Sequence, residues 1–253
     1  MRAPGGPERG RRPGSRSPAP REVSRALDRL ERMFGRPRPE RSFPPLDELI
    51  LTVLSQNTND GNRDRAYRSL RRRFPTWSKV LAADRGAVES AIRVGGLART
   101  KSRVIQEILG RLQAERGTLD LDFLRRMPLQ EAREYLARFR GVGEKTIRCV
   151  LLFSCGRQVF PVDTHIHRVA RRLGWVPSGA TRETSHAILG GLIPGDRSLA
   201  AHVNFITLGR RLCRPRAPAC PACPLQDSCD FARTSRRMPR RARPVRRAAQ
   251  RAS

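Results

Sequence analysis

The sequence predicts an all-α fold, and three features of the chain support this prediction. Apolar residues recur at intervals of three and four through most of the chain, which is the period of an amphipathic helix. Proline and glycine interrupt these runs often enough to separate helices of ordinary length. No segment alternates apolar and polar residues with the period of two that is typical of half-buried strands.

The composition indicates a polyanionic partner. The 253 residues carry a formal net charge of +29. Fifteen arginines and one glutamate lie in residues 1–21 and 231–253, two tails that we expect to be disordered. The remaining chain still has 37 basic against 22 acidic residues, so it is basic in its own right. Aromatic residues make up only 5%, which disfavours a stacking platform for single-stranded nucleic acid.

Membrane and secretory signals are missing from the sequence. No apolar run approaches the roughly 18 residues of a membrane helix, and the N-terminus lacks the apolar stretch of a signal peptide. We therefore expect no membrane contact and a cytoplasmic, nucleoid-associated protein of a prokaryote.

The first helices follow from the periodicity. Residues 22–34 place an apolar stripe on one face, and a group of prolines ends this helix. Residues 46–54 are strongly apolar and are predicted to form a helix buried in the core. The polar segment 55–60 that follows is typical of a helix end and turn.

The middle of the chain predicts a basic helix followed by shorter apolar ones. Residues 64–74 carry five arginines, which is usually a solvated face. Further helices are predicted at 77–82, 86–92, 102–115 and 119–127, with a glycine-containing loop at 95–101. Later helices are expected at 169–175, 178–189 and 198–212.

Residues 129–154 predict two helices joined by a tight glycine turn. Gly141 and Gly143 interrupt the helical period, because glycine accepts backbone angles that other residues resist. The second helix then starts with free backbone N–H groups, which suit a phosphate. An ordinary helical corner is the alternative. A Walker A loop is excluded because Glu144 separates Gly143 from Lys145, and a dinucleotide fingerprint is excluded because Thr146 stands where its third glycine is needed.

Lys145 and Asp163 are the candidate catalytic pair. Lys145 is one of only three lysines among 52 basic residues. A chain this rich in arginine indicates that lysine is kept where an amine is needed, because guanidinium cannot act as a nucleophile; a phosphate-contacting lysine is the alternative. Asp163 directly precedes an apolar helical stretch, so it is a predicted N-cap. Its carboxylate is also suited to accept a proton or to stabilise positive charge.

Four cysteines near the C-terminus form a candidate metal site. Cys213, Cys220, Cys223 and Cys229 are separated by six, two and five residues. Four thiolates at this spacing predict a shared zinc ion or an iron–sulfur cluster. Disulfides are disfavoured in an intracellular DNA-binding protein.

These motifs together resemble the endonuclease III family of DNA glycosylases. Gly-Val-Gly-Glu-Lys-Thr at 141–146, followed by Val-Asp-Thr-His at 162–165, resembles its helix–hairpin–helix and aspartate loop. The resemblance implies that Lys145 forms a Schiff base with the sugar, that Asp163 assists, and that Gly141, Val142 and Gly143 hold the DNA backbone. The family usually has Leu-Pro before the hairpin, where this chain has Phe-Arg. The plant 5-methylcytosine glycosylases also carry Arg-Gly there, along with the Phe-Pro-Val-Asp-Thr that this chain has at 160–164.

The resemblance extends to the remaining motifs. It implies that Gln56 and Asn57 contact the base left unpaired when its partner is extruded, and that Leu97 wedges into the opposite strand; a core position is the alternative for Leu97. The cysteine spacing matches the family's [4Fe-4S] loop without a gap. Arg214 and Arg216 within that loop would then grip a phosphate.

The implied fold has two helical lobes. A six-helix barrel would span 47–157, and an iron–sulfur domain would combine 22–46 with 158–230. The implied activity is removal of oxidised or damaged pyrimidines from double-stranded DNA by a monomeric enzyme, followed by β-elimination at the abasic site. Two alternatives are the same fold acting on mismatched or methylated pyrimidines, and a non-catalytic helix–hairpin–helix DNA-binding protein.

Overall fold

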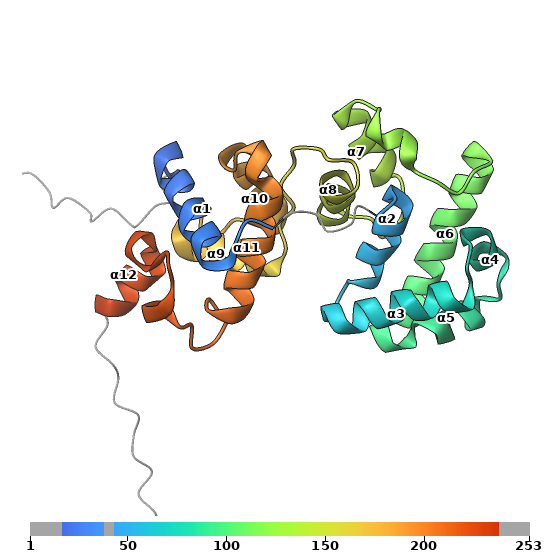
Figure 1. Cartoon of the computed structure of the whole chain (residues 1–253), viewed down its shortest axis with the longest axis horizontal. Helices are drawn as coiled ribbons and strands as arrows, with labels where there is room; N and C mark the ends of the chain where they lie inside the picture. The colour runs from blue at the N-terminus through green and yellow to red at the C-terminus, as the bar shows by residue number, and fades with distance from the viewer. Residues whose placement is uncertain (1–16, 38–42, 238–253) are drawn as a thin grey trace, which may run out of the picture.

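The structure, a computed structural model, describes residues 17–37 and 43–237. Every regular element in these ranges is an α-helix or a short 3-10 helix, and they contain no strand, which confirms the predicted all-α fold. Figure 1 shows the helices gathered into two lobes that lie side by side along the longest axis.

Each lobe is built from a different set of helices. One lobe contains α2 (Pro45–Leu54), α3 (Asp60–Arg73), α4 (Trp77–Ala82), α5 (Arg85–Ile92), α6 (Ala98–Arg116), α7 (Leu129–Ala137) and α8 (Glu144–Phe153). The other contains α1 (Pro20–Phe34), α9 (Thr164–Leu173), α10 (Arg182–Leu192), α11 (Ser198–Arg211) and α12 (Asp230–Arg237). The 3-10 helices of the described chain are η1 (Arg93–Gly95), η2 (Asp122–Arg125), η3 (Gly195–Arg197), η4 (Cys220–Ala222) and η5 (Gln226–Ser228).

The α2 helix is the centre of the first lobe. Its apolar residues Leu49, Ile50 and Leu54 are all fully buried, as the sequence predicts for this segment. They belong to a hydrophobic cluster whose members run from Leu46 to Val159 in the chain. Helix α8 packs directly against α2, so the glycine hairpin that precedes α8 lies close to the end of α2.

The second lobe joins the two ends of the described chain. Helix α1 packs against α11, and α11 packs against α9. Phe205 on α11 lies edge-on between Phe160 and Trp175, with ring centroids 6.5 and 5.6 Å away.

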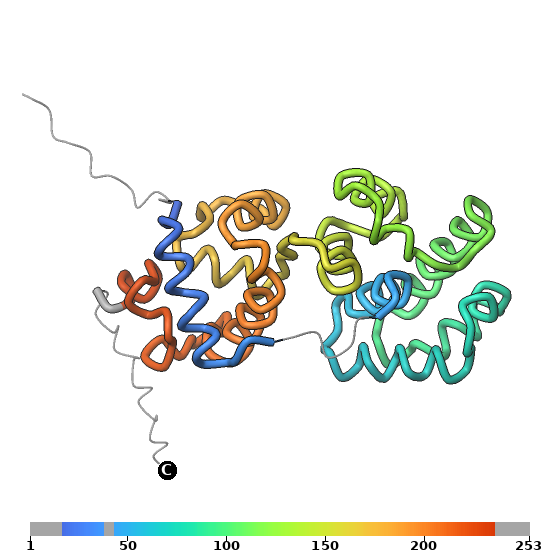
Figure 2. The backbone as a smooth tube through the Cα atoms, turned by 45° about the horizontal axis from the view of Figure 1, so that its top comes forward, coloured from blue at the N-terminus to red at the C-terminus, as the bar shows by residue number. Residues whose placement is uncertain are grey.

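The chain passes between the lobes twice, once after α1 and once after α8 (Figure 2). Whether 47–157 folds as an independent domain stays a prediction.

The C-terminal tail begins later than the sequence predicts. Residues 230–237 form α12, although 231–253 were expected to be disordered. The helix forms because two of its residues find partners in the second lobe. Ala232 is buried, and the guanidinium carbon of Arg172 lies over the ring of Phe231, 4.5 Å from the ring centroid. At the other end, α1 already includes Pro20 and Arg21, which were assigned to the N-terminal tail. The remaining tail residues, 1–16 and 238–253, lie outside the described residues.

A search of the described helices for one both long and apolar enough to cross a membrane finds none.

Replacing Phe205 with alanine tests the core of the second lobe. Phe205 is 1% exposed and touches two aromatic rings, so Phe205→Ala is expected to lower the free energy of unfolding by about 3–5 kcal/mol. Urea unfolding followed by circular dichroism measures this. Met33→Ala is the control, since Met33 is 46% exposed and should change the value by less than about 0.5 kcal/mol. Equal, small effects of both variants would contradict the packing described.

Candidate active site

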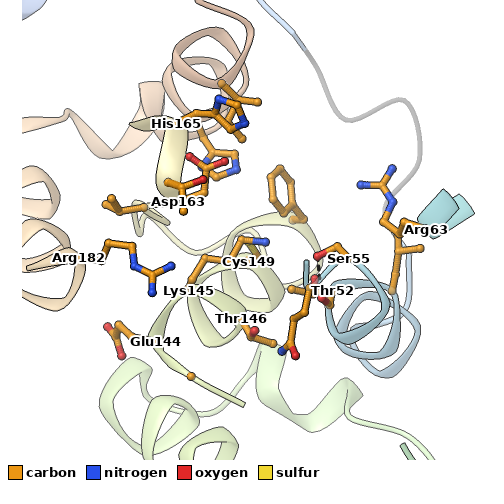
Figure 3. A pocket seen from close by; sticks show the side chains of 18 of the residues that line it. Thr52, Ser55, Arg63, Glu144, Lys145, Thr146, Cys149, Asp163, His165 and Arg182 are labelled. Atoms are coloured by element: carbon orange, nitrogen blue, oxygen red, sulfur yellow. Dashed lines mark hydrogen bonds between the residues drawn. The ribbon is translucent and has the colours of Figure 1, made fainter. Parts of the chain in front are cut away.

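A cavity of about 800 Å³ lies between the two lobes. Helices α2, α3 and α8 of one lobe line it, together with α9, α10 and α11 of the other. Lys145 and Asp163 both line it, and Figure 3 shows their side chains projecting into the same space from α8 and from the start of α9. The two residues that the sequence singles out, 18 positions apart, therefore meet in one cavity.

Lys145 lies in the first turn of α8, and its side chain is half-buried. A hydrogen bond links it to the thiol of Cys149, one helical turn further along. Burial raises the pKa of that thiol to about 11, although the nearby Lys145 charge opposes the rise. The thiol is thus neutral near pH 7, so it positions the amine without forming a thiolate–ammonium pair.

Asp163 is the N-cap of α9, as predicted. Its Oδ1 accepts a hydrogen bond from the backbone N–H of Ile166 at 2.7 Å. The N-terminal end of a helix carries a partial positive charge, which stabilises the carboxylate there. The cap also fixes the direction of the side chain at the edge of the cavity.

Two buried histidines that were not singled out hold the segment leading to Asp163. His202 Nδ1 lies 3.0 Å from the carbonyl oxygen of Pro161, and His186 Nδ1 accepts from the N–H of Val162 at 3.2 Å. Burial, together with the charge of Lys145, holds the pKa of His202 well below its ordinary value. Both residues line the cavity. Each of these histidines stands alone in a helical segment, so the sequence did not predict that they would hold the residues before Asp163.

His165 also lines the cavity. Its Nδ1 lies 3.1 Å from an Nη atom of Arg168, which in turn donates to the carbonyl of Gly209 at 2.8 Å. This residue therefore braces the start of α9 against α11.

Glu48 is a further cavity residue that the sequence did not single out. It lies on the apolar helix α2, is 9% exposed, and accepts a hydrogen bond from Thr52 at 3.1 Å. Burial raises the pKa of its carboxyl to about 7, against the lowering effects of Thr52, Lys145 and Arg63. The sequence contains no sign of a functional role for this glutamate, because the periodicity of a helix does not show which residues of other helices a side chain will face.

The glycine hairpin has the geometry of a backbone anion site. Gly141 has φ +81°, and a Cβ atom there would meet Val104 at 3.1 Å, so both the angle and the space require glycine. Val142 is buried and anchors the turn, while Gly143 is the N-cap of α8. The first N–H groups of α8 have no partners within the helix and are suited to an anion.

The 55–60 segment is tied to this hairpin. Gln56 Nε2 donates to the carbonyl of Gly141 at 3.2 Å, and Gln56 and Asn57 both line the cavity. Asn57 has φ +52°, in the left-handed region. The Asn57 side chain is exposed, and its neighbour Gln56 ties this segment to the hairpin.

Leu97 is not a core residue. Its side chain is 54% exposed, the largest value among the exposed large hydrophobic residues of the described chain, and its φ is +50°. Holding a leucine in this region costs conformational energy. Exposure removes the core alternative and leaves Leu97 available for contact with a partner.

A buried lysine joins the Leu97 loop to the end of α2. Lys101 is 2% exposed, and its Nζ donates to the carbonyls of Leu54 and Gly95, each at 2.8 Å. The first carbonyl lies just before the 55–60 segment, and the second lies two residues before Leu97. Lys101 therefore fixes the spacing between Asn57 and Leu97.

The four C-terminal cysteines lie in one neighbourhood. Cys213, Cys220 and Cys223 pack against the same hydrophobic cluster that contains Cys229. Burial and the charges of the other three thiols raise the pKa of Cys223 to about 11. Among the described residues, no three His, Cys, Asp or Glu side chains are gathered closely enough to hold one metal ion.

Arg172 organises the cysteine loop. Its guanidinium lies 3.2 Å from the sulfur of Cys213 and donates to the carbonyls of Arg214 at 2.7 Å and Pro215 at 2.9 Å. The thiol of Cys229 lies 3.1 Å from the backbone carbonyl of Arg172. Arg214 and Arg216 have exposed side chains on this loop. The thiols thus lie beside a cation that suits a group bearing negative charge.

Comparison with known proteins agrees with this geometry. Residues 50–194 match the HhH-GPD superfamily of base excision DNA repair proteins. An Arabidopsis thaliana protein named as a DNA glycosylase is 44% identical over 165 residues, which is 65% of this chain and 56% of that protein. Endonuclease III of Thermotoga maritima is 34% identical over 197 residues, 78% of this chain and 88% of that enzyme.

A solved structure has the same architecture. A trapped endonuclease III–DNA covalent intermediate superimposes with a TM-score of 0.73 and 27% identity, covering 86% of this chain and 99% of that one. This chain therefore spans nearly the whole of that solved protein and about half of the plant relative.

Replacing Asp163 separates its capping role from its charge. Asp163→Ala is expected to lower the free energy of unfolding by about 1 kcal/mol, because the N–H of Ile166 loses its acceptor. Asp163→Ser keeps an N-cap oxygen and should stay within about 0.5 kcal/mol of the wild type. Thermal unfolding of the two variants at matched pH is the measurement. An equal loss in both would show that the carboxylate charge, rather than the cap, stabilises α9.

Proposed function

Because the chain belongs to the HhH-GPD superfamily of base excision DNA repair proteins, we propose that it is a DNA glycosylase that also cleaves the abasic site it produces. The observation that carries this proposal is that Lys145 and Asp163 line one cavity, next to a hairpin suited to bind phosphate. The chain supplies the nucleophile, the carboxylate and the phosphate site from a single polypeptide, so we infer a monomeric enzyme.

The proposed reaction begins with binding of double-stranded DNA. The N–H groups that follow Gly141 and Gly143 bind a backbone phosphate, and Arg214 and Arg216 bind another. A damaged base, whose pairing or stacking is weak, leaves the helix and enters the cavity. Leu97 and the amides of Gln56 and Asn57 fill the space it leaves, and their fixed spacing through Lys101 supports this joint role.

The chemistry is proposed to use the amine of Lys145. Its neutral form attacks the sugar carbon, and the bond from that carbon to the base breaks with its electron pair on the base. Asp163, at the other side of the cavity, stabilises the positive charge that develops on the sugar. The Schiff base so formed lowers the barrier to β-elimination of the 3′ phosphate, which leaves a nicked strand.

Oxidised pyrimidines are the proposed substrates. Mismatched or methylated pyrimidines form the second candidate, favoured by Arg-Gly at 140–141 and Phe-Pro-Val-Asp-Thr at 160–164, which resemble the plant 5-methylcytosine glycosylases. Duplexes that each contain one such base distinguish the two, because only the preferred base is released in a single turnover. A prokaryotic, nucleoid-associated setting stays a prediction, since the relatives include a plant protein.

We further propose that Cys213, Cys220, Cys223 and Cys229 hold a [4Fe-4S] cluster. Their shared neighbourhood and the adjacent Arg172 guanidinium fit a group with negative charge. A cluster binds each cysteine to a different iron, whereas zinc needs all its ligands at one ion. When bound, it would cross-link the loop that carries Arg214 and Arg216.

Replacing Lys145 tests the nucleophile. Lys145→Gln is expected to bind an abasic duplex but to form a borohydride-trapped adduct at least about 10³-fold more slowly than the wild type. Lys79→Gln is the matched control, because Lys79 is exposed and lies outside the cavity lining. Full adduct formation by Lys145→Gln would refute the assignment. A wild type that forms no adduct would leave a non-catalytic DNA-binding protein.

Replacing one cysteine tests the cluster. The wild type, purified without oxygen, is expected to contain about four irons and four acid-labile sulfides per chain. Cys223→Ser should lose most of both and the visible absorption that accompanies them. Cys155→Ser is the control, since Cys155 lies in the other lobe. One zinc ion per wild-type chain, with no iron, would contradict the proposal.

A further inference from the structure

Glu48 is a carboxyl group where the fold has no structural need of one. It lies on α2, a largely apolar helix in which Leu49, Ile50 and Leu54 are fully buried. Taking an ionised carboxylate out of water is unfavourable unless a partner compensates for it. Its side chain faces the cavity rather than solvent, since it is 9% exposed and lines the same space as Lys145.

The groups around Glu48 come from two helices. Lys145 and Cys149 face it from α8, and Arg63 and Tyr67 face it from α3. Thr52, which lies on α2 with Glu48, donates a hydrogen bond to the Glu48 carboxyl. Despite the two cations, burial raises the pKa of Glu48 to about 7. The group therefore changes its protonation state near neutral pH, as a general base must.

The other cavity carboxylate is committed elsewhere. Asp163 accepts from the N–H of Ile166 and caps α9, whose positive end stabilises its charge. The Asp163 carboxylate thus caps a helix end, whereas Glu48 is buried on α2 with a hydrogen bond from Thr52. Two carboxyl groups in such different surroundings divide the work between charge stabilisation and proton transfer.

We propose that Glu48 is a second catalytic carboxyl group, which accepts the proton that the Lys145 amine must lose before it attacks the sugar. The inference rests on the proposed function, because it needs Lys145 to be the nucleophile. It assigns proton transfer to α2 and leaves Asp163 as the stabiliser of positive charge.

The proton is conserved through the step. On an abasic site, the Glu48 carboxylate takes a proton from the Lys145 ammonium, which gives a carboxylic acid and a free amine. The amine nitrogen forms a bond to the aldehyde carbon, and the carbonyl electrons pass to oxygen with one amine proton. The acid then protonates this hydroxyl, which leaves as water while the carbon–nitrogen double bond forms. The net change is ammonium plus aldehyde to iminium plus water, with Glu48 again ionised.

The test is the pH dependence of Schiff-base formation. The full-length wild type, Glu48→Gln and Asp47→Asn are each mixed in excess with an abasic duplex, and the rate of the cyanoborohydride-trapped adduct is measured from about pH 6 to about 9.5. Asp47→Asn is the matched control. It removes a carboxylate from the same helix, but Asp47 contacts Tyr67 and Trp77 and does not line the cavity.

The wild-type rate should rise through about pH 7 as Glu48 ionises, and then level off. Glu48→Gln should be at least about 10²-fold slower near pH 7 and should approach the wild type at higher pH, because the rising hydroxide concentration then replaces the carboxylate as the base. Asp47→Asn should follow the wild type at every pH.

Two results would overturn the proposal. A Glu48→Gln rate equal to the wild type, or lower by the same factor at every pH, would show that Glu48 takes no part or acts through structure alone. A wild type that gives no adduct at any pH would remove the proposed function itself, and with it this inference. Unfolding temperatures of the three proteins identify a variant that has lost its fold, and Glu48→Asp then replaces Glu48→Gln: it keeps the base, so its pH profile must retain the rise near pH 7.

Discussion

The packing of α2 against α8 is the contact on which the rest of the site depends. It brings an apolar helix that carries one buried carboxyl group against a short helix that begins with a hairpin and a lysine. Both helices line the cavity, so the buried Glu48 and the half-buried Lys145 share one wall, where partial burial strengthens charge interactions. The same contact joins the end of α2 to the hairpin through Gln56 and Gly141. A shift of either helix would therefore disturb the phosphate site and the lysine together.

The three lysines show how an arginine-rich chain uses the rarer cation. Lys79 is exposed, whereas Lys101 is buried and Lys145 is half-buried at the cavity. Lys101 directs a compact ammonium at two carbonyl oxygens, each 2.8 Å away, and its side chain is 2% exposed. The expectation that lysine is retained where its geometry or chemistry matters thus applies to a structural position as well as to the candidate nucleophile.

Sequence reasoning found the parts of this site that are encoded locally. The glycine hairpin, the N-cap at Asp163 and the all-α fold each depend on neighbouring residues, so periodicity and turn chemistry were enough. Glu48, His186 and His202 escaped notice because their roles arise from helices far apart in the chain. The same is true of α12. Its arginine-rich composition predicted a disordered tail, but the helix forms because Phe231 and Ala232 pack against the second lobe.

The double passage of the chain between the lobes has a consequence for how the protein folds. Helix α1 is synthesised first, but its packing partner α11 lies more than 160 residues later. The helices of the first lobe, by contrast, follow one another in the chain from α2 to α8. On the ribosome, α1 must therefore wait for its partner α11, which is synthesised after every helix of the first lobe. The N-terminal helix is then among the last elements to be placed, and α11 can add its side of the cavity only after the lysine-bearing helix α8 has been synthesised.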